Sequence, residues 1–150
     1  LLVGGVGVGK TEIARRVERF WGPPGAQLWS EPALLAEIRR TYSEGRDQIK
    51  VIRHINRARL LIIDDLGASH VKTESLPWLH EIYWNIFDRR LEQRRPTLIT
   101  TNFKLSDIED WIGERAGSRL MGMIGKKQNI VNLFGVPDYR SSWMFEETGA

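Results

Sequence analysis

The sequence contains no cysteine among its 150 residues. This absence excludes a disulfide framework and any metal site built on thiolates. The sequence also lacks an apolar run near the roughly 20 residues that a membrane-spanning helix needs, and no signal peptide is visible. Its three histidines, His54, His70 and His80, do not have the H-E-x-x-H spacing of a zinc site. We therefore expect a cytoplasmic protein without zinc and without a membrane partner.

The sequence also has no large excess of either charge sign. The 22 lysines and arginines face 19 acidic residues, which gives a net charge of +3. A small positive excess is compatible with nucleic-acid contact without indicating it. The length suits one domain with a real core, residues 1–150. Because the chain begins without methionine and inside an apolar run, we expect a further N-terminal segment in the complete protein.

What the sequence does contain is a phosphate-binding motif near its start. Residues 4–11, GGVGVGKT, match the P-loop pattern G-x-x-x-x-G-K-[ST]. The apolar residues 1–3 before the motif predict the end of a buried strand. A helix is predicted behind the motif by apolar residues at helical spacing: Ile13, Ala14, Val17 and Phe20. The motif therefore lies between a strand and a helix, which is the context that it requires.

Each residue type of the motif suits a triphosphate. Glycines allow positive φ and bring successive N–H groups close to an anion, and the helix behind them points its positive end at the same phosphates. We expect Lys10 to reach the β- and γ-phosphates and the Thr11 hydroxyl to hold Mg²⁺. The predicted cofactors are ATP or ADP with Mg²⁺. The predicted nucleotide contacts are Gly5, Val6, Gly7, Val8, Gly9, Lys10, Thr11 and Glu12.

Strand and helix patterns alternate along the rest of the chain. This order implies right-handed crossovers and an α/β fold of three layers, the P-loop NTPase fold, around a central parallel five-stranded sheet. Ligands bind such sheets at the carboxyl ends of the strands. Strands are predicted at 1–3, 26–29, 60–65, 97–101 and 129–133. Helices are predicted behind the P-loop, from the Ser30 cap to residue 42, and at 48–57, about 75–93 and 105–121, the last in one or two pieces.

Polar residues end one of these strands and directly follow the next. Asp64 and Asp65 come directly after four apolar residues, an arrangement that resembles a Walker B element. We expect Asp64 to hold Mg²⁺ opposite Thr11, and Asp65 to polarise the attacking water. The alternative is a solvated pair that caps the strand end. Many hydrolysing relatives carry glutamate at the second position, so the shorter Asp65 predicts slow, switch-like hydrolysis of ATP to ADP and phosphate.

Asn102 follows the next strand, at the position of the sensor residue of AAA+ ATPases. An amide there can touch both the γ-phosphate and the attacking water. A simple turn-forming asparagine is the alternative, because asparagine is common at strand ends.

Two arginines, Arg115 and Arg119, lie four residues apart and therefore on one helix face. They can form ordinary surface salt bridges, which contribute little to stability. The other interpretation is an arginine finger inserted into the ATP site of a neighbouring copy, where such fingers supply about 10³–10⁵ in rate. The second interpretation predicts an oligomer.

The segments GGVGVGKT, LLIIDDLG, RRPTLITTN, IGERAGSRL and DYRS, in this order, resemble the ATPase domain of replicative helicase loaders of the DnaC/DnaI type. Transposition helper ATPases of the IstB type are similar and share most of the pattern. The resemblance spans essentially the whole chain. It implies an AAA+ ATPase domain without a C-terminal helical lid. It also implies that the domain joins single-stranded DNA and delivers the replicative DNA helicase, which the segment before Leu1 would contact.

The resemblance also assigns roles to individual residues. It implies that Arg119 is the finger, that Arg115 accompanies it at the interface of a ring or helical oligomer, and that Arg140 is a sensor-2-like arginine near the γ-phosphate; a solvated tail arginine is the alternative for Arg140. Regions expected to touch single-stranded DNA contain Tyr42 and Ser75, with Lys72 as a further candidate. An aromatic ring can stack on a base for about 1–3 kcal/mol, although Tyr42 also continues an apolar stripe and fits a core residue.

Two other functions remain open at this point. The P-loop also occurs in small-molecule kinases, but the polar strand end Thr100-Thr101-Asn102 and the lack of a recognisable lid argue against a kinase. A nucleotide-dependent DNA-binding module with an idle Asp65 is the other alternative. The residues do not separate a helicase loader from a transposition helper.

Overall fold

A five-stranded parallel sheet forms the centre of the computed structural model, which describes residues 1–45 and 47–138 apart from the side chains of residues 42 and 43. The strands lie in the order β2-β3-β4-β1-β5, and every pair is parallel. The predicted parallel sheet is therefore confirmed. The strands are β1 (Leu2–Val3), β2 (Ala26–Ser30), β3 (Leu60–Leu66), β4 (Thr97–Thr101) and β5 (Val131–Asn132).

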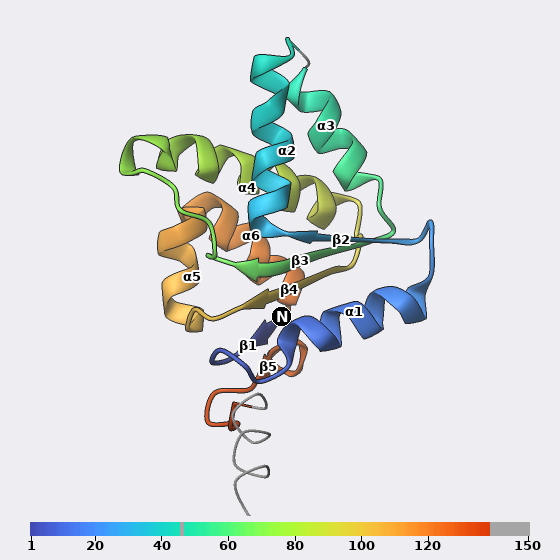
Figure 1. Cartoon of the computed structure of the whole chain (residues 1–150), viewed down its shortest axis with the longest axis vertical. Helices are drawn as coiled ribbons and strands as arrows, with labels where there is room; N and C mark the ends of the chain where they lie inside the picture. Colours follow the sequence, from blue (N-terminus) through green and yellow to red (C-terminus); the bar gives the residue numbers. More distant parts are fainter. Residues whose placement is uncertain (46, 139–150) are drawn as a thin grey trace, which may run out of the picture.

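The predicted helices are present with small shifts at their ends (Figure 1). The hydroxyl of Ser30 caps α2 by accepting a hydrogen bond from the amide of Ala33, as expected. The pattern over 105–121 corresponds to two helices, because Gly113 adopts a φ of 85° between them. The helices are α1 (Lys10–Trp21), α2 (Glu31–Ser43), α3 (Gln48–Asn56), α4 (Leu76–Glu92), α5 (Leu105–Ile112) and α6 (Glu114–Ile124), with 3-10 turns at Thr73–Ser75 and Lys127–Asn129.

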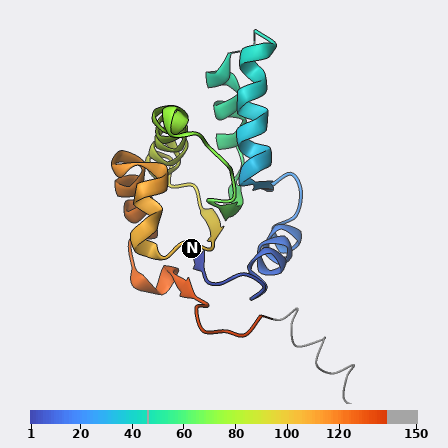
Figure 2. The ribbon, with the colours of Figure 1, turned by 60° about the vertical axis from the view of Figure 1, so that its left-hand side comes forward.

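The two faces of the sheet are covered unequally (Figure 2). Helix α1 packs on one face, where Ala14 contacts Leu60 and Ile62. The alternate residues of β3, Leu61 and Ile63, point to the other face and into the main core, which α2 to α6 complete. Burial on both faces explains why β3 shows no alternation of apolar and polar residues.

The last strand is shorter than predicted. The prediction covered 129–133, but the 3-10 turn Lys127–Asn129 takes up its beginning, so β5 contains only Val131–Asn132. Between β5 and residue 138, the described part of the chain forms no helix, and so no helical lid is present there. No helix within 1–45 and 47–138 has the length and apolar character to span a membrane.

The carboxyl ends of β1, β3 and β4 meet at one edge of the sheet, on the left in Figure 1. A register shift between Ile63 and Leu66 interrupts the pairing of β3 with β4 at this edge. The extra backbone places Asp65 at a φ of 61°, a conformation that aspartate tolerates better than most residues. The irregularity therefore lies beside Asp64 and Asn102, which the sequence analysis identified as candidate site residues.

Candidate nucleotide-binding site

The P-loop connects β1 with α1 and forms one wall of a pocket of about 460 Å³. Gly7 and Gly9 adopt φ values of 80° and 89°, which a side chain would strain. A Cβ atom on Gly7 would also lie 1.9 Å from Oδ1 of Asp138, so the carboxylate of Asp138 approaches the loop closely. The pocket is lined by Val6, Gly7, Gly9, Lys10, Thr11, Glu12, Arg15, Asp65 and Asn102.

Lys10 is a buried charged residue of this pocket, with 7% of the residue exposed. Its ammonium donates to the carbonyl oxygens of Gly4 and Gly5, at 2.9 and 2.6 Å, and to Oδ1 of Asn102 at 2.7 Å. Burial lowers the pKa of Lys10 below its ordinary value of 10.5, and the charges of Asp65 and Asp64 oppose this shift. The ammonium is thus held where an anionic ligand of the loop would meet it.

Asp64 and Thr11 lie together on the floor of the site. The Thr11 hydroxyl donates to Oδ1 of Asp64 at 3.2 Å, and the Thr100 hydroxyl donates to the same oxygen at 2.6 Å. Asp64 is buried, so its carboxylate has a fixed orientation. A hydroxyl and a carboxylate oxygen in contact are the ligand types that Mg²⁺ takes beside phosphate oxygens. The two residues expected to hold Mg²⁺ therefore fit that ion in chemistry and in position.

Asn102 joins the lysine and the second aspartate. Its Nδ2 donates to Oδ1 of Asp65 at 3.1 Å, while its Oδ1 accepts from Lys10. The amide of Asp65 donates to the Thr100 hydroxyl at 2.8 Å, which fixes the backbone at the irregular end of β3. The structure brings Lys10, Asp65 and Asn102 together, as their positions after parallel strands predict.

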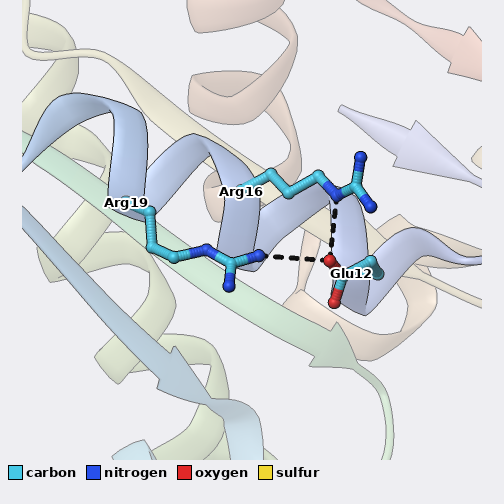
Figure 3. Close-up of polar contacts among 3 residues, drawn as sticks. All are labelled: Glu12, Arg16 and Arg19. Carbon is cyan, nitrogen blue, oxygen red and sulfur yellow. Dashed lines mark hydrogen bonds and ion pairs between the residues drawn. The ribbon is translucent and has the colours of Figure 1, made fainter.

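Glu12 was expected to contact nucleotide, and it lines the pocket. Its carboxylate, however, accepts from Nε of Arg16 at 2.9 Å and from a terminal nitrogen of Arg19 at 3.1 Å, along the outer side of α1 (Figure 3). The hydrogen bond from Arg16 is the main cause that lowers the pKa of Glu12. Because the carboxylate is engaged with arginines, the group of Glu12 available to a phosphate is its backbone amide in the first turn of α1.

The two arginines of α6 do not line this pocket. Nε of Arg119 lies 2.6 Å from Oδ1 of Asp88, and the Arg115 guanidinium lies 4.2 Å from the centre of the Trp84 ring. Both partners belong to α4, so α4 orients the side chains of α6. Within one copy of the chain, these arginines are therefore separate from the nucleotide pocket.

Two of the three residues expected to touch DNA have side chains that the structure describes. Lys72 is exposed and Ser75 half-buried, at the entry to α4. Tyr42 belongs to α2, but its side chain lies outside the described part of the structure. Arg140 also lies outside the described residues.

The buried charge of Glu31 was missed from the sequence. Glu31, the first residue of α2, is fully buried, and its carboxylate accepts hydrogen bonds from four different residues. An acidic residue in the first turn of a helix is ordinary, because it complements the helix dipole. The sequence therefore carried no signal that Glu31 is internal.

Comparison with known families now identifies the chain, because the model of IstB-like ATP binding proteins matches residues 1–135. The chain belongs to this family. The P-loop and the strand-end carboxylates described above thus lie in an IstB-like ATP-binding domain. No curated protein sequence matches the chain.

The solved structures similar to this IstB-like domain include a helicase loader and a replication initiator. The DnaC helicase loader has a TM-score of 0.67 at 24% identity, over 89% of this chain and 75% of that one. DnaI has a TM-score of 0.55 at 19% identity, over 89% and 71%. The replication initiator DnaA, bound to AMPPCP and single-stranded DNA, has a TM-score of 0.70 at 17% identity, over 89% of this chain and 39% of that one. At these identities the similarity establishes the P-loop NTPase fold, and the predicted resemblance to the DnaC/DnaI type is confirmed.

Proposed function

We propose that this IstB-like domain is a slow ATPase whose nucleotide state controls assembly with single-stranded DNA and delivery of a replicative helicase. One observation carries the catalytic part of the proposal. The Asn102 amide contacts Lys10 with its oxygen and Asp65 with its nitrogen, so a single side chain links the phosphate-binding and water-activating groups.

In the proposed reaction each residue has one role. Lys10 exchanges its bonds to backbone carbonyls for the β- and γ-phosphates, while Thr11 and Asp64 would hold Mg²⁺. When bound, the ion neutralises charge on the phosphates. Asp65 accepts a proton from the attacking water, and Asn102 orients that water against the γ-phosphate.

The site is completed by a second copy of the chain in this proposal. Arg119 of a neighbour would stabilise the charge that develops on the transferred phosphoryl group, with Arg115 beside it at the interface. Support comes from their position on α6, away from the pocket of their own chain. A finger of this kind contributes about 10³–10⁵ in rate, which corresponds to on the order of 4–7 kcal/mol.

The DNA-related part of the proposal is supported by the solved structures that share this fold. DnaC is a helicase loader, and the similar DnaA structure contains single-stranded DNA. We assign contacts with single-stranded DNA to Lys72, Ser75 and Tyr42. Residues 1–150 then form the ATPase domain, and a segment before Leu1 would contact the helicase.

A second candidate is a transposition helper ATPase, because the matching family model is the IstB-like one. The ATP chemistry is the same in both cases, and the partner differs. Capture of a replicative helicase by the full-length protein supports the loader, whereas capture of a transposase supports the helper.

The experiment that tests the proposed activity is phosphate release by the full-length protein with Mg²⁺, in the presence and absence of single-stranded DNA. We expect slow hydrolysis that DNA changes, and its loss in the Asp64→Asn variant. Phosphate transfer to a nucleoside or sugar, instead of to water, would contradict the proposal.

A further inference from the structure

The Glu31 carboxylate is a heavily hydrogen-bonded side chain outside the nucleotide pocket. Its Oε2 accepts from the amides of Gly67 and Ser69, at 3.0 and 2.9 Å. Its Oε1 accepts from the Tyr83 hydroxyl at 2.5 Å and from Nε1 of Trp111 at 2.8 Å. Three separate segments therefore meet on one buried carboxylate: the loop after β3, helix α4 and helix α5.

All four donors are neutral groups, so their hydrogen bonds, together with the positive end of the α2 dipole, stabilise the buried charge of Glu31. A buried charge is costly unless its hydrogen-bonding capacity is filled. Burial, and then the charge and hydrogen bond of Glu31, raise the pKa of Tyr83 well above 10.0, so the tyrosine remains a donor. Each donor compensates the same charge. If one of the three segments moves away from Glu31, the carboxylate loses part of that compensation and the arrangement of all three segments is destabilised.

The loop bound by Glu31 starts at Gly67, two residues after Asp65. The amide of Ala68 donates to the carbonyl of Asp65 at 3.0 Å, which closes a tight turn at the strand end. Gly67 adopts a φ of 94°, and a Cβ atom on it would lie 2.3 Å from the Phe103 ring. The loop is thus held between the carboxylate of Glu31 and the ring of Phe103.

Phe103 connects this arrangement back to the nucleotide pocket. Its ring packs edge-on against Trp111, with 6.1 Å between ring centres, and Trp111 donates to Glu31. Phe103 also follows Asn102 in the chain, and Asn102 donates to Asp65. The contacts therefore form a closed circuit from Asp65 through the loop, Glu31, Trp111 and Phe103 to Asn102.

Helix α5 carries the circuit toward the arginines of α6. Trp111 is the last residue but one of α5, and Gly113 alone separates α5 from α6. Gly113 is bonded to both helices, because its amide donates to the carbonyl of Glu109 in α5 and its carbonyl accepts from the amide of Gly117 in α6, each at 2.8 Å. A displacement of Trp111 is thus passed to the helix that bears Arg119.

From this geometry we propose that Glu31 is a positioning residue that couples the Asp65–Asn102 pair to the α5–α6 unit. The inference rests on the proposed ATPase function and deepens it by naming the group that links nucleotide state to the interface arginines. Glu31 does not touch the nucleotide. It sets the positions of the loop and of α5, on which water activation and assembly depend.

The substitution Glu31→Gln is the sharpest probe. Glutamine keeps the size of the side chain but has one acceptor oxygen, and its NH₂ group would face donors. Glu37→Gln is the matched control, because Glu37 lies on the same helix and pairs at the surface with Arg40 at 2.9 Å. Both variants lose one negative charge, but only Glu31→Gln disturbs the circuit of contacts between Asp65 and Asn102.

In full-length protein we expect Glu31→Gln to speed amide hydrogen exchange at Gly67 and Ser69 by about tenfold or more. ATP affinity should stay within about threefold of the parent, while turnover and ATP-dependent assembly fall about tenfold. Glu37→Gln should change none of these. Unchanged exchange at the two amides, or equal losses of ATP affinity and turnover, would overturn the proposal.

Trp111→Phe supplies a second test if Glu31→Gln does not fold. It removes one donor to Glu31 and keeps an aromatic ring against Phe103, so a smaller change in the same direction is expected. The exchange measurement needs no ATPase activity. An absence of hydrolysis in the parent protein would therefore refute the proposed function, whereas unaltered exchange in both variants would refute the role of Glu31.

Discussion

The Lys10 ammonium and the Asn102 amide oxygen lie 2.7 Å apart, although 92 residues separate them in the chain. This contact fixes which way the amide points, because the lysine requires an acceptor and Asp65 on the other side requires a donor. A carboxylate or an aliphatic side chain cannot satisfy both neighbours. The asparagine is thus specified by its surroundings.

Asn102→Ala should lower turnover by about 10–100-fold, because a group that orients the attacking water is lost. ATP affinity should change by less than about threefold, since Lys10 keeps its place in the loop. Steady-state kinetics together with calorimetric titration of ATP would separate the two effects. Equal losses of turnover and affinity would mean that Asn102 only shapes the pocket.

Arg119→Ala should reduce turnover by about 10³-fold while ATP affinity is retained. The reason is that Arg119 lies outside the pocket of its own chain and would act on a neighbour. Asp88→Asn should give a smaller loss, because it removes the 2.6 Å contact that orients Arg119 without removing the arginine. Both variants should stay within about 1 kcal/mol of the parent in unfolding free energy, as is usual for partly exposed ion pairs. Weaker ATP binding in either variant would speak against a role in trans.

ATP affinity should fall at high pH, and the fall should begin below the ordinary lysine pKa of 10.5. Burial lowers the pKa of Lys10, and only the protonated ammonium attracts phosphates. Bound phosphates favour the charged form of Lys10 and raise its pKa, so ATP binding takes up a proton at alkaline pH. ATP affinity therefore weakens as the pH rises through the pKa that Lys10 has in the nucleotide-free site. Titrations between about pH 7 and 10 would measure this dependence. In Lys10→Arg the arginine stays protonated over this pH range, so this part of the pH dependence of ATP affinity should disappear.

Arg90 should be one of the largest single contributors to stability. It is fully buried and donates to the Thr97 hydroxyl and to the carbonyls of Asn56, Ala58 and Pro96, at 2.6–3.4 Å. Burial, followed by the nearby Arg95, lowers its pKa from 12.5 to about 10, so it remains charged at neutral pH.

Replacing Arg90 by methionine leaves those acceptors without their donor, and we expect a loss of about 3–5 kcal/mol. Arg94→Met, at an exposed position four residues further on, should cost less than about 0.5 kcal/mol. Denaturant unfolding of both variants checks the difference. Similar stability of the two would contradict the role assigned to Arg90.

Much of the fold and of the pocket could be predicted because the informative residues lie at or directly after the carboxyl ends of strands. The P-loop, Asp64 and Asn102 each end a strand pattern, and parallel strands bring such ends together. The register shift that gives Asp65 its φ of 61° leaves no trace in the sequence, because it depends on how β3 pairs with β4.

The buried polar groups could not be predicted for a related reason. The donors to Glu31 lie 36 to 80 residues away, so its burial is decided by tertiary packing alone. Arg90 resembles an ordinary basic residue near a helix end, where cations are common. Its acceptors belong to the ends of other elements. Local pattern therefore identified the residues at the ends of strands and missed those that hold the elements together.

The claim that an ATP site is completed by a neighbouring copy can be tested by mixing two inactive proteins. Lys10→Ala keeps Arg119 but should not bind ATP, and Arg119→Ala binds ATP but has no finger. If the finger acts in trans, ATP turnover should appear on mixing and should be greatest near equal amounts of the two. Turnover that never exceeds the sum of the separate proteins, at concentrations where they associate, would contradict the account.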